Sequence, residues 1–293
     1  MTIETAASGD GVKIAYESTG AGTPVLFIHE FGGDMRSWQG QVDALSDRFQ
    51  CVRFNARGYP PSDVPPPGRY SQPLATADAI AVLDALGIGR AHIVGVSMGG
   101  YTSLNLAVDH PGRVRSVTVA GCGWGSDPAG RQLFEAEQRT LVSALRDVGW
   151  AGIVDSYAMS PARATLRRKS ETAWRAFRDG LAEHSSEGSA NTMEGVQLTR
   201  PTLDDLIPGL ARSGRPLLII TGDEDDGAIE ANYRLKRTLE TASWAVLART
   251  GHAVNLEEPQ VFAETFARFV ESVDSGAWKP RDRDALVFSS TGL

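Results

Sequence analysis

The sequence predicts an α/β fold in which a mostly parallel sheet is flanked by helices. Short apolar runs rich in β-branched residues alternate with helix-like stretches over residues 12–120, and the alternation resumes after residue 214. These runs lack an apolar–polar alternation, which is typical of strands buried on both faces. Helices between such strands indicate parallel crossover connections. The chain has 293 residues and is 42% hydrophobic, enough to bury one large core together with an insertion.

The elements follow one another regularly along the two core segments. Each short apolar run predicts a strand, at 12–17, 25–28, 51–54, 93–96, 114–120, 217–221 and 244–247. Helices are expected between them at 36–45, 75–86 and 101–109, with a proline-rich loop at 60–73.

The pattern changes between residues 123 and 213, where no strand-like run occurs. Helices are expected at 133–147, 149–158, 161–168 and 172–184, and residues 184–192 read as a polar linker between helices. We therefore expect a core made of residues 1–122 and 214–293, interrupted by a helical cap at 123–213. Residues 276–293 show no clear pattern, and this tail is expected either to wrap the surface or to be mobile.

The segment Gly-Val-Ser-Met-Gly at 95–99 is the strongest chemical signal in the chain. It follows an apolar run and precedes a helix-like stretch, which is the strand–turn–helix setting of a G-x-S-x-G nucleophile elbow. A turn this sharp requires small flanking residues and holds the Ser97 hydroxyl at its tip. The helix that begins behind Ser97 stabilises negative charge near its N-terminus. Ser97 is therefore the candidate nucleophile.

An acid and a base are needed to activate such a serine, and both occur later in the chain in the expected order. The strand at 217–221 ends in an acidic loop that contains Asp223, Asp225 and Asp226, and the strand at 244–247 is followed by His252. Loops at the carboxyl ends of parallel strands meet at one edge of a sheet, so these groups can converge on Ser97. His252 is the candidate general base, because a neutral imidazole can take a proton and later return it.

With these motifs the chain resembles the serine hydrolase branch of the α/β-hydrolase superfamily. Further motifs of that family are His-Glu-Phe-Gly-Gly at 29–33, Arg-Gly-Tyr-Pro-Pro-Ser at 57–62 and Asn-Leu-Glu-Glu-Pro at 255–259. The resemblance implies a mostly parallel, eight-stranded sheet flanked by helices, with a helical cap inserted after the sixth strand.

The resemblance also implies roles for individual residues. It places the triad acid three residues after Gly222, at Asp225, with Asp226 as the alternative. It implies an oxyanion hole formed by the backbone N–H groups of Phe31 and Met98. The chain departs from the family pattern at Glu30, where glycine is common. We expect the Glu30 side chain to point away from the oxyanion and to pair with an arginine.

A serine at the elbow indicates acyl chemistry, whereas relatives that attack alkyl carbon carry aspartate there. Residues 37–42, 83–88 and 97–100 resemble 3-oxoadipate enol-lactonases, and the same signatures occur in carboxylesterases and C–C hydrolases. We therefore expect a cofactor-free serine hydrolase that cleaves a small carboxylic ester or lactone through an acyl-enzyme. The alternatives are a C–C bond hydrolase of a ring-cleavage diketone, a ligand receptor with little turnover, and a cofactor-free oxygenase or haloperoxidase.

Substrate-binding residues are expected mainly in the cap, where Trp124, His184 and Asn191 are the candidates. No metal site and no cofactor site are expected. A formal net charge of −7 without a basic cluster argues against a nucleic-acid partner, and the chain lacks a run of 18 apolar residues, so no membrane contact is expected. The first residues lack signal-peptide features. We expect a cytoplasmic enzyme that is a monomer or a homodimer.

Overall fold

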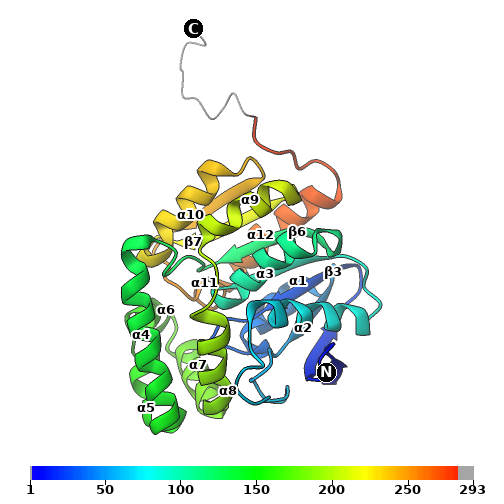
Figure 1. Ribbon diagram of the computed structural model, residues 1–293. Coiled ribbons are helices and arrows are strands. Elements are labelled where there is room, and N and C mark those ends of the chain that lie inside the picture. The colour runs from blue at the N-terminus through cyan, green and yellow to red at the C-terminus, as the bar shows by residue number, and fades with distance from the viewer. Residues whose placement is uncertain (1, 283–293) are drawn as a thin grey trace.

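The computed structural model describes residues 2–282, with the side chain of Ala129 excepted, and places eight strands in one sheet (Figure 1). The order across the sheet is β1-β2-β4-β3-β5-β6-β7-β8, and every neighbouring pair from β4 to β8 is parallel. The strands are β1 Glu4–Ala7, β2 Lys13–Thr19, β3 Thr23–Ile28, β4 Phe49–Phe54, β5 Ala91–Val96, β6 Val114–Ala120, β7 Leu217–Gly222 and β8 Ala242–Leu247. The mostly parallel, eight-stranded sheet is thereby confirmed.

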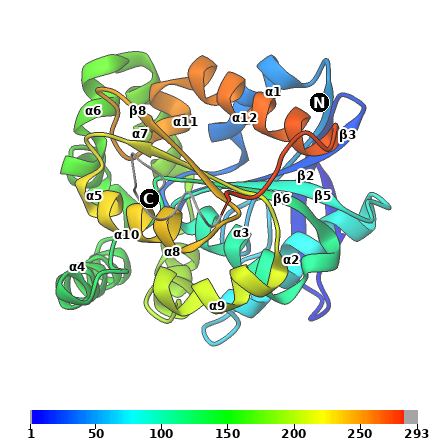
Figure 2. The ribbon, with the colours of Figure 1, turned by 90° about the horizontal axis from the view of Figure 1, so that it is seen from above.

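Helices cover both faces of this sheet (Figure 2). One face is covered by α1 Gln39–Leu45 and α12 Pro259–Asp274. The rings of Trp38, just before α1, and of Phe266 in α12 pack on Phe27 of β3, and Phe262 of α12 packs on Trp38. The other face is covered by α2 Gln72–Ala85, α3 Met98–Asp109, α9 Leu203–Ser213 and α10 Asp226–Thr238. The central strands β3 and β5 are buried almost throughout, which explains why their sequences show no apolar–polar alternation.

The segment between β6 and β7 is helical, as expected. It contains α4 Pro128–Asp147, α5 Gly149–Ala158, α6 Pro161–Lys169, α7 Glu171–Glu183, α8 Ser186–Thr192 and a π-helical turn at Met193–Gln197, followed by α9. The α9 helix packs against α3 in the core layer, whereas α4 to α8 stand to one side of the sheet (Figures 1 and 2). The limits of the two domains stay a prediction from the sequence.

The prediction of a polar linker at 184–192 is wrong, because this segment forms the buried helix α8. The Ser185 hydroxyl accepts a hydrogen bond from the Gly188 N–H at 3.0 Å and caps the helix. Gly188 lies so close to the loop after β4 that a Cβ there would stand 2.1 Å from the Gly58 carbonyl oxygen. Small polar residues here allow close packing, and the composition alone resembled that of a linker.

The two ends of the described chain contain one strand that the sequence did not predict and a short segment that packs on the core. Strand β1 was not anticipated, because it is a short edge strand that is mostly exposed. In the tail predicted at 276–293, Trp278 packs against the core, and residues 283–293 lie outside the described part of the chain. Within the described part, no helix is long and apolar enough to cross a membrane.

Candidate active site

Ser97 lies at the turn between β5 and α3, in a backbone conformation that L-residues rarely adopt, with φ 51° and ψ −111°. Its N–H donates to the Ala120 carbonyl at the end of β6, at 2.8 Å. A Cβ at Gly95 would stand 2.2 Å from the Gly99 carbonyl carbon, and one at Gly99 would stand 2.1 Å from the Ile28 carbonyl oxygen. Backbone contacts on both sides therefore explain the two glycines and hold the partly exposed Ser97 at the tip of the turn.

His252 lies beside Asp225, the acid that the family resemblance implies. The Nδ1 atom of His252 is 3.2 Å from both carboxylate oxygens of Asp225, which occupies the position just before the first residue of α10. Asp223 instead accepts a hydrogen bond from the Thr250 N–H, and Asp226 is exposed at the start of α10. Of the three aspartates, only Asp225 forms a hydrogen bond with His252 among the described contacts.

Backbone contacts connect this histidine loop to the serine turn. Gly121 follows the Ala120 carbonyl that holds Ser97, and a Cβ at Gly121 would lie 3.4 Å from His252 Nδ1. Buried Glu257 accepts hydrogen bonds from the N–H groups of Gly251 and Ala253, on either side of His252, at 2.6 and 3.2 Å. Sequence reasoning missed this role of Glu257, although the residue belongs to the Asn-Leu-Glu-Glu-Pro motif.

Phe31 and Met98 belong to one cluster of buried apolar residues that also includes cap residues such as Trp150. Met98 is the first residue of α3, so its N–H has no acceptor within that helix. The loop that carries Phe31 is held by the buried His29 ring: Nε2 accepts from the Ala56 N–H at 3.0 Å, and Nδ1 donates to the Glu30 carbonyl at 2.7 Å. Burial lowers the pKa of His29 to about 4, so the ring stays neutral and has this structural role.

Glu30 has the arginine partner that we expected. Its carboxylate pairs with Arg163 of the cap helix α6, and both side chains are almost fully buried. The guanidinium carbon of Arg163 also lies 4.4 Å from the centre of the Phe177 ring. Burial opposes the charge of Arg163, but the Glu30 carboxylate more than offsets this and raises the pKa of Arg163 above its usual value. The pair therefore joins the cap to the residue before Phe31. No sequence signal identified Arg163.

The three cap candidates for substrate binding lie in different surroundings. Trp124 packs edge-on against Phe134 at 6.4 Å and contacts Gly227. His184 is buried beside Asp34 and lines a cavity at the edge of the cap. Asn191 is buried in α8, where its side-chain oxygen faces Arg146 at 3.4 Å. Within residues 2–282, no hydrogen bond, ion pair or ring contact joins these three side chains into one site.

The pKa of His252 sets an expected pH dependence. Burial disfavours the imidazolium, but the charge and hydrogen bond of Asp225 outweigh this effect and raise the pKa of His252 above its usual value. Since a general base must be unprotonated, kcat/KM should fall as the pH drops through this raised pKa. Asp225→Asn removes the negative charge, so the acidic limb of the pH–rate profile should move to lower pH, and the plateau should fall steeply.

A matched control for this experiment is Asp226→Asn, which changes an exposed neighbour of Asp225. It should leave both the limb and the plateau of the profile in place. An Asp226→Asn profile that shifts while the Asp225→Asn profile does not would reverse the assignment of the acid.

Comparison with known proteins places the chain in a family. The alpha/beta hydrolase fold family matches residues 23–259. This chain belongs to the alpha/beta hydrolase fold family. The 3-oxoadipate enol-lactonase 1 of Acinetobacter baylyi is 28% identical over 250 residues, which cover 85% of this chain and 89% of that protein.

Two solved structures illustrate the likeness in fold. An enol-lactonase from Burkholderia xenovorans superposes with a TM-score of 0.80 at 24% identity, covering 92% of this chain and 100% of that one. A thermophilic esterase from Thermogutta terrifontis superposes with a TM-score of 0.82 at 24% identity, covering 93% of this chain and 99% of that one. At this identity the two structures support the alpha/beta hydrolase fold alone.

Proposed function

We propose that the chain cleaves a small carboxylic ester or lactone through a Ser97-His252-Asp225 triad and an acyl-enzyme, without a cofactor. That it is a hydrolase acting on ester-like bonds follows from its family and relatives. The observation that carries the proposal is the pairing of His252 with Asp225 on a loop that adjoins the strained Ser97 turn.

The chemistry follows from the positions of these groups. The Ser97 oxygen attacks the substrate carbonyl carbon while His252 takes the hydroxyl proton, and Asp225 stabilises the imidazolium. The N–H groups of Phe31 and Met98 hold the oxyanion of the tetrahedral intermediate. When the C–O bond breaks, His252 gives its proton to the leaving oxygen. Water then attacks the acyl-enzyme with His252 as base, which releases the acid and restores Ser97.

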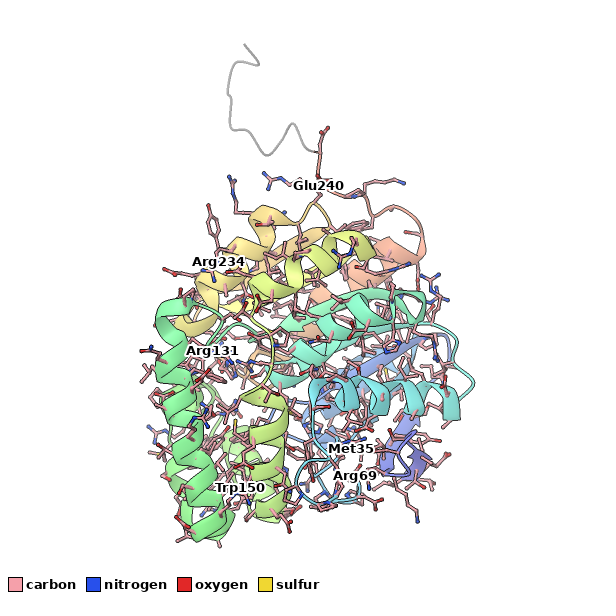
Figure 3. All side chains as sticks on the ribbon, viewed as in Figure 1. Met35, Arg69, Arg131, Trp150, Arg234 and Glu240 are labelled. Carbon is pink, nitrogen blue, oxygen red and sulfur yellow. The ribbon has the colours of Figure 1, made fainter. Side chains whose placement is uncertain are left out.

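The surroundings support an acyl group that is small and largely apolar. The Phe31 ring lies 6.3 Å from Trp150 and 6.4 Å from Tyr157, both on the cap helix α5, and Figure 3 shows Trp150 among the cap helices. A Cβ at Gly32 would lie 3.1 Å from both Tyr157 and Phe177, so these rings already crowd the residue after Phe31. Aromatic side chains this close to the proposed oxyanion hole favour a compact apolar acyl group.

A substrate panel tests the proposal. Short-chain esters, lactones, thioesters and ring-cleavage dienones are assayed side by side with the purified protein. We expect ester or lactone turnover to exceed dienone turnover. Faster turnover of dienones would favour the C–C hydrolase alternative.

The same panel tests the receptor alternative. Negligible turnover across it, with thermal stabilisation by one of its members, would favour a ligand receptor on this fold. A small-molecule partner, a cytoplasmic location and a monomeric or homodimeric state remain part of the proposal and rest on the sequence.

A further inference from the structure

The last two residues of the cap helix α6 reach the loops that carry the proposed acid and base. Arg168 pairs with Glu224, in the loop after β7, at 2.8 Å. Lys169 donates a hydrogen bond to the Thr250 hydroxyl at 2.9 Å and pairs with Glu258, both in the chain after β8. The end of one cap helix therefore contacts the segments on both sides of the proposed acid–base pair.

Thr250 joins these two segments to each other. It is fully buried and lies two positions before His252. Its N–H donates to the Asp223 carboxylate at 3.1 Å, and its carbonyl accepts from the Glu224 N–H at 2.9 Å. Because Asp225 follows Glu224 directly, a shift of Thr250 is transmitted to both the acid and the base.

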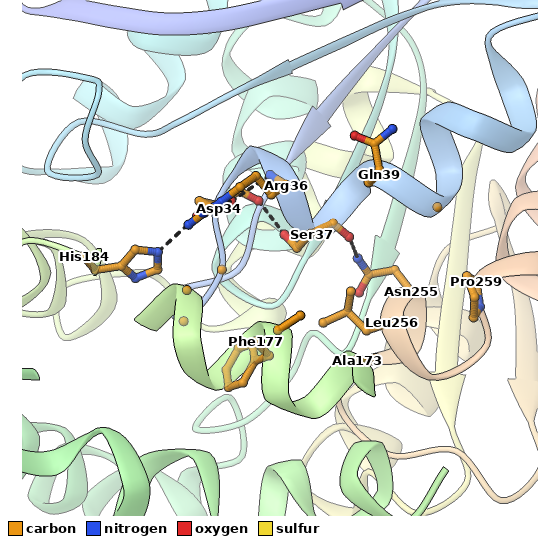
Figure 4. Close-up of a pocket in the computed structure, with 15 residues that line it drawn as sticks. Asp34, Arg36, Ser37, Gln39, Ala173, Phe177, His184, Asn255, Leu256 and Pro259 are labelled. Carbon is orange, nitrogen blue, oxygen red and sulfur yellow. Dashed lines mark hydrogen bonds and ion pairs between the residues drawn. The ribbon is translucent and has the colours of Figure 1, made fainter. Parts of the chain in front are cut away.

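The histidine segment, residues 249–258, is held by the core on one side and by α6 on the other. It includes the short helix α11 Val254–Glu257, in which the Asn255 amide donates to the Ser37 carbonyl at 3.0 Å (Figure 4). Towards α7 it borders a cavity of about 390 Å³ that lies between α7 and the segment 32–40. Within residues 2–282, the hydrogen bonds from the cap to the histidine segment come from the last two residues of α6.

These contacts are better suited to positioning than to stabilising the fold. The side chains of Arg168 and Glu224 are 50% and 37% exposed, and ion pairs this exposed add little to stability. Lys169 is only 17% exposed, and its amine has two partners, Thr250 and Glu258. Catalysis is more sensitive than stability to small displacements, since a misplacement of about 1 Å can cost about a hundredfold in rate.

We propose that Lys169 is a positioning residue for the hydrolysis, which fixes Thr250 and thereby holds His252 against Asp225. Lys169 acts through Thr250 and not on the substrate. The inference rests on the proposed function, in which His252 takes the proton of Ser97. It gives the cap a part in aligning the triad, carried by the end of α6.

Lys169→Met tests the proposal, because methionine keeps much of the side-chain length but lacks the amine. We expect kcat for a short-chain ester to fall about ten- to a hundredfold and KM to stay within about twofold, since substrate still binds while the base is misplaced. Arg167→Met removes the same charge from an exposed position of α6 and should leave kcat within about twofold. Equal kcat in the two variants would overturn the proposal.

Two substitutions at Thr250 separate positioning from a general loss of stability. Thr250→Val keeps the shape and the backbone hydrogen bonds but lacks the hydroxyl that Lys169 binds, so kcat should fall as it does in Lys169→Met. Thr250→Ser keeps the hydroxyl and should recover most of kcat. In the double variant Lys169→Met/Thr250→Val the losses should not multiply, since both changes break one contact. Multiplying losses would show that Lys169 does not act through Thr250.

Proton NMR separates this inference from the mechanism on which it rests. The His252 Nδ1 proton, which lies between that nitrogen and Asp225, should give a low-field signal that His252→Gln abolishes. Loss of the signal in Lys169→Met but not in Arg167→Met would support the positioning role even without ester turnover, a combination that refutes only the proposed function. An unchanged signal in a fully active Lys169→Met protein would refute only the positioning role.

Discussion

Replacing Ser97 with alanine should lower kcat for ester hydrolysis by about 10⁵- to 10⁶-fold and leave the fold intact. The loss is large because no other described hydroxyl occupies this turn, and the acyl-enzyme cannot form without it. Stability should change little, since Ser97 is partly exposed and its side chain makes no cap hydrogen bond to α3. Alanine meets the same strain at positive φ as serine, so the turn itself is unaffected.

The steady-state turnover rate is measured with a short-chain ester for the wild-type and Ser97→Ala proteins. Thermal unfolding of the same two proteins measures their stability. Ser143→Ala makes the same chemical change at an exposed position of α4 and should retain full activity. A purified Ser97→Ala protein that keeps wild-type turnover, with mass spectrometry confirming the substitution, would refute the proposed nucleophile.

Arg163→Met should destabilise the protein by about 3–5 kcal/mol, because it leaves Glu30 charged and buried without its partner. Ester hydrolysis should fall as well, since Glu30 immediately precedes the proposed oxyanion donor Phe31 and an unpaired carboxylate there opposes the developing negative charge. Urea unfolding and kcat/KM for a short-chain ester measure the two effects. Arg175→Met breaks the exposed pair with Glu171 and should change stability by no more than about 1 kcal/mol.

A double-mutant cycle shows whether the unpaired charge is the cause. In Arg163→Met/Glu30→Leu neither charge remains, and most of the lost stability should return. Recovery is expected because the native pair is itself incompletely hydrogen-bonded: within residues 2–282, Glu30 Oε1 has no hydrogen-bond partner. A single Arg163→Met variant as stable as Arg175→Met would contradict this account of the pair.

The parts of the fold that the sequence predicts well are those in which local pattern and tertiary environment agree. The strands at 25–28 and 93–96 are continuous apolar runs and become β3 and β5, which are buried on both faces. Helix α8 was missed for the opposite reason. Its serine, glycine and asparagine residues are typical of a loop, and only its close contact with Gly58 shows why small residues are needed there.

The candidate site also contains some residues whose positions the sequence predicts and others whose contacts it does not. Ser97, Asp225 and His252 follow strand ends in a fixed order, so topology alone brings them to one edge of the sheet. The partner of Glu30 could not be read from the chain, because Arg163 lies 133 positions away on a cap helix whose packing no periodicity specifies. Likewise, Glu257 accepts hydrogen bonds from two backbone N–H groups. Because almost every residue has a backbone N–H, the sequence does not show which of them Glu257 binds.

The sequence by itself determined the class of chemistry, because a serine at a strand–turn–helix junction, followed by an acid and a histidine after later strands, has few other physical uses. Only the tertiary structure decided how the cap meets the core. The Glu30–Arg163 pair, the buried helix α8 and the cavity between α7 and the segment 32–40 all depend on side chains distant in sequence. Such contacts depend on packing between elements, whereas local patterning specifies only the elements themselves.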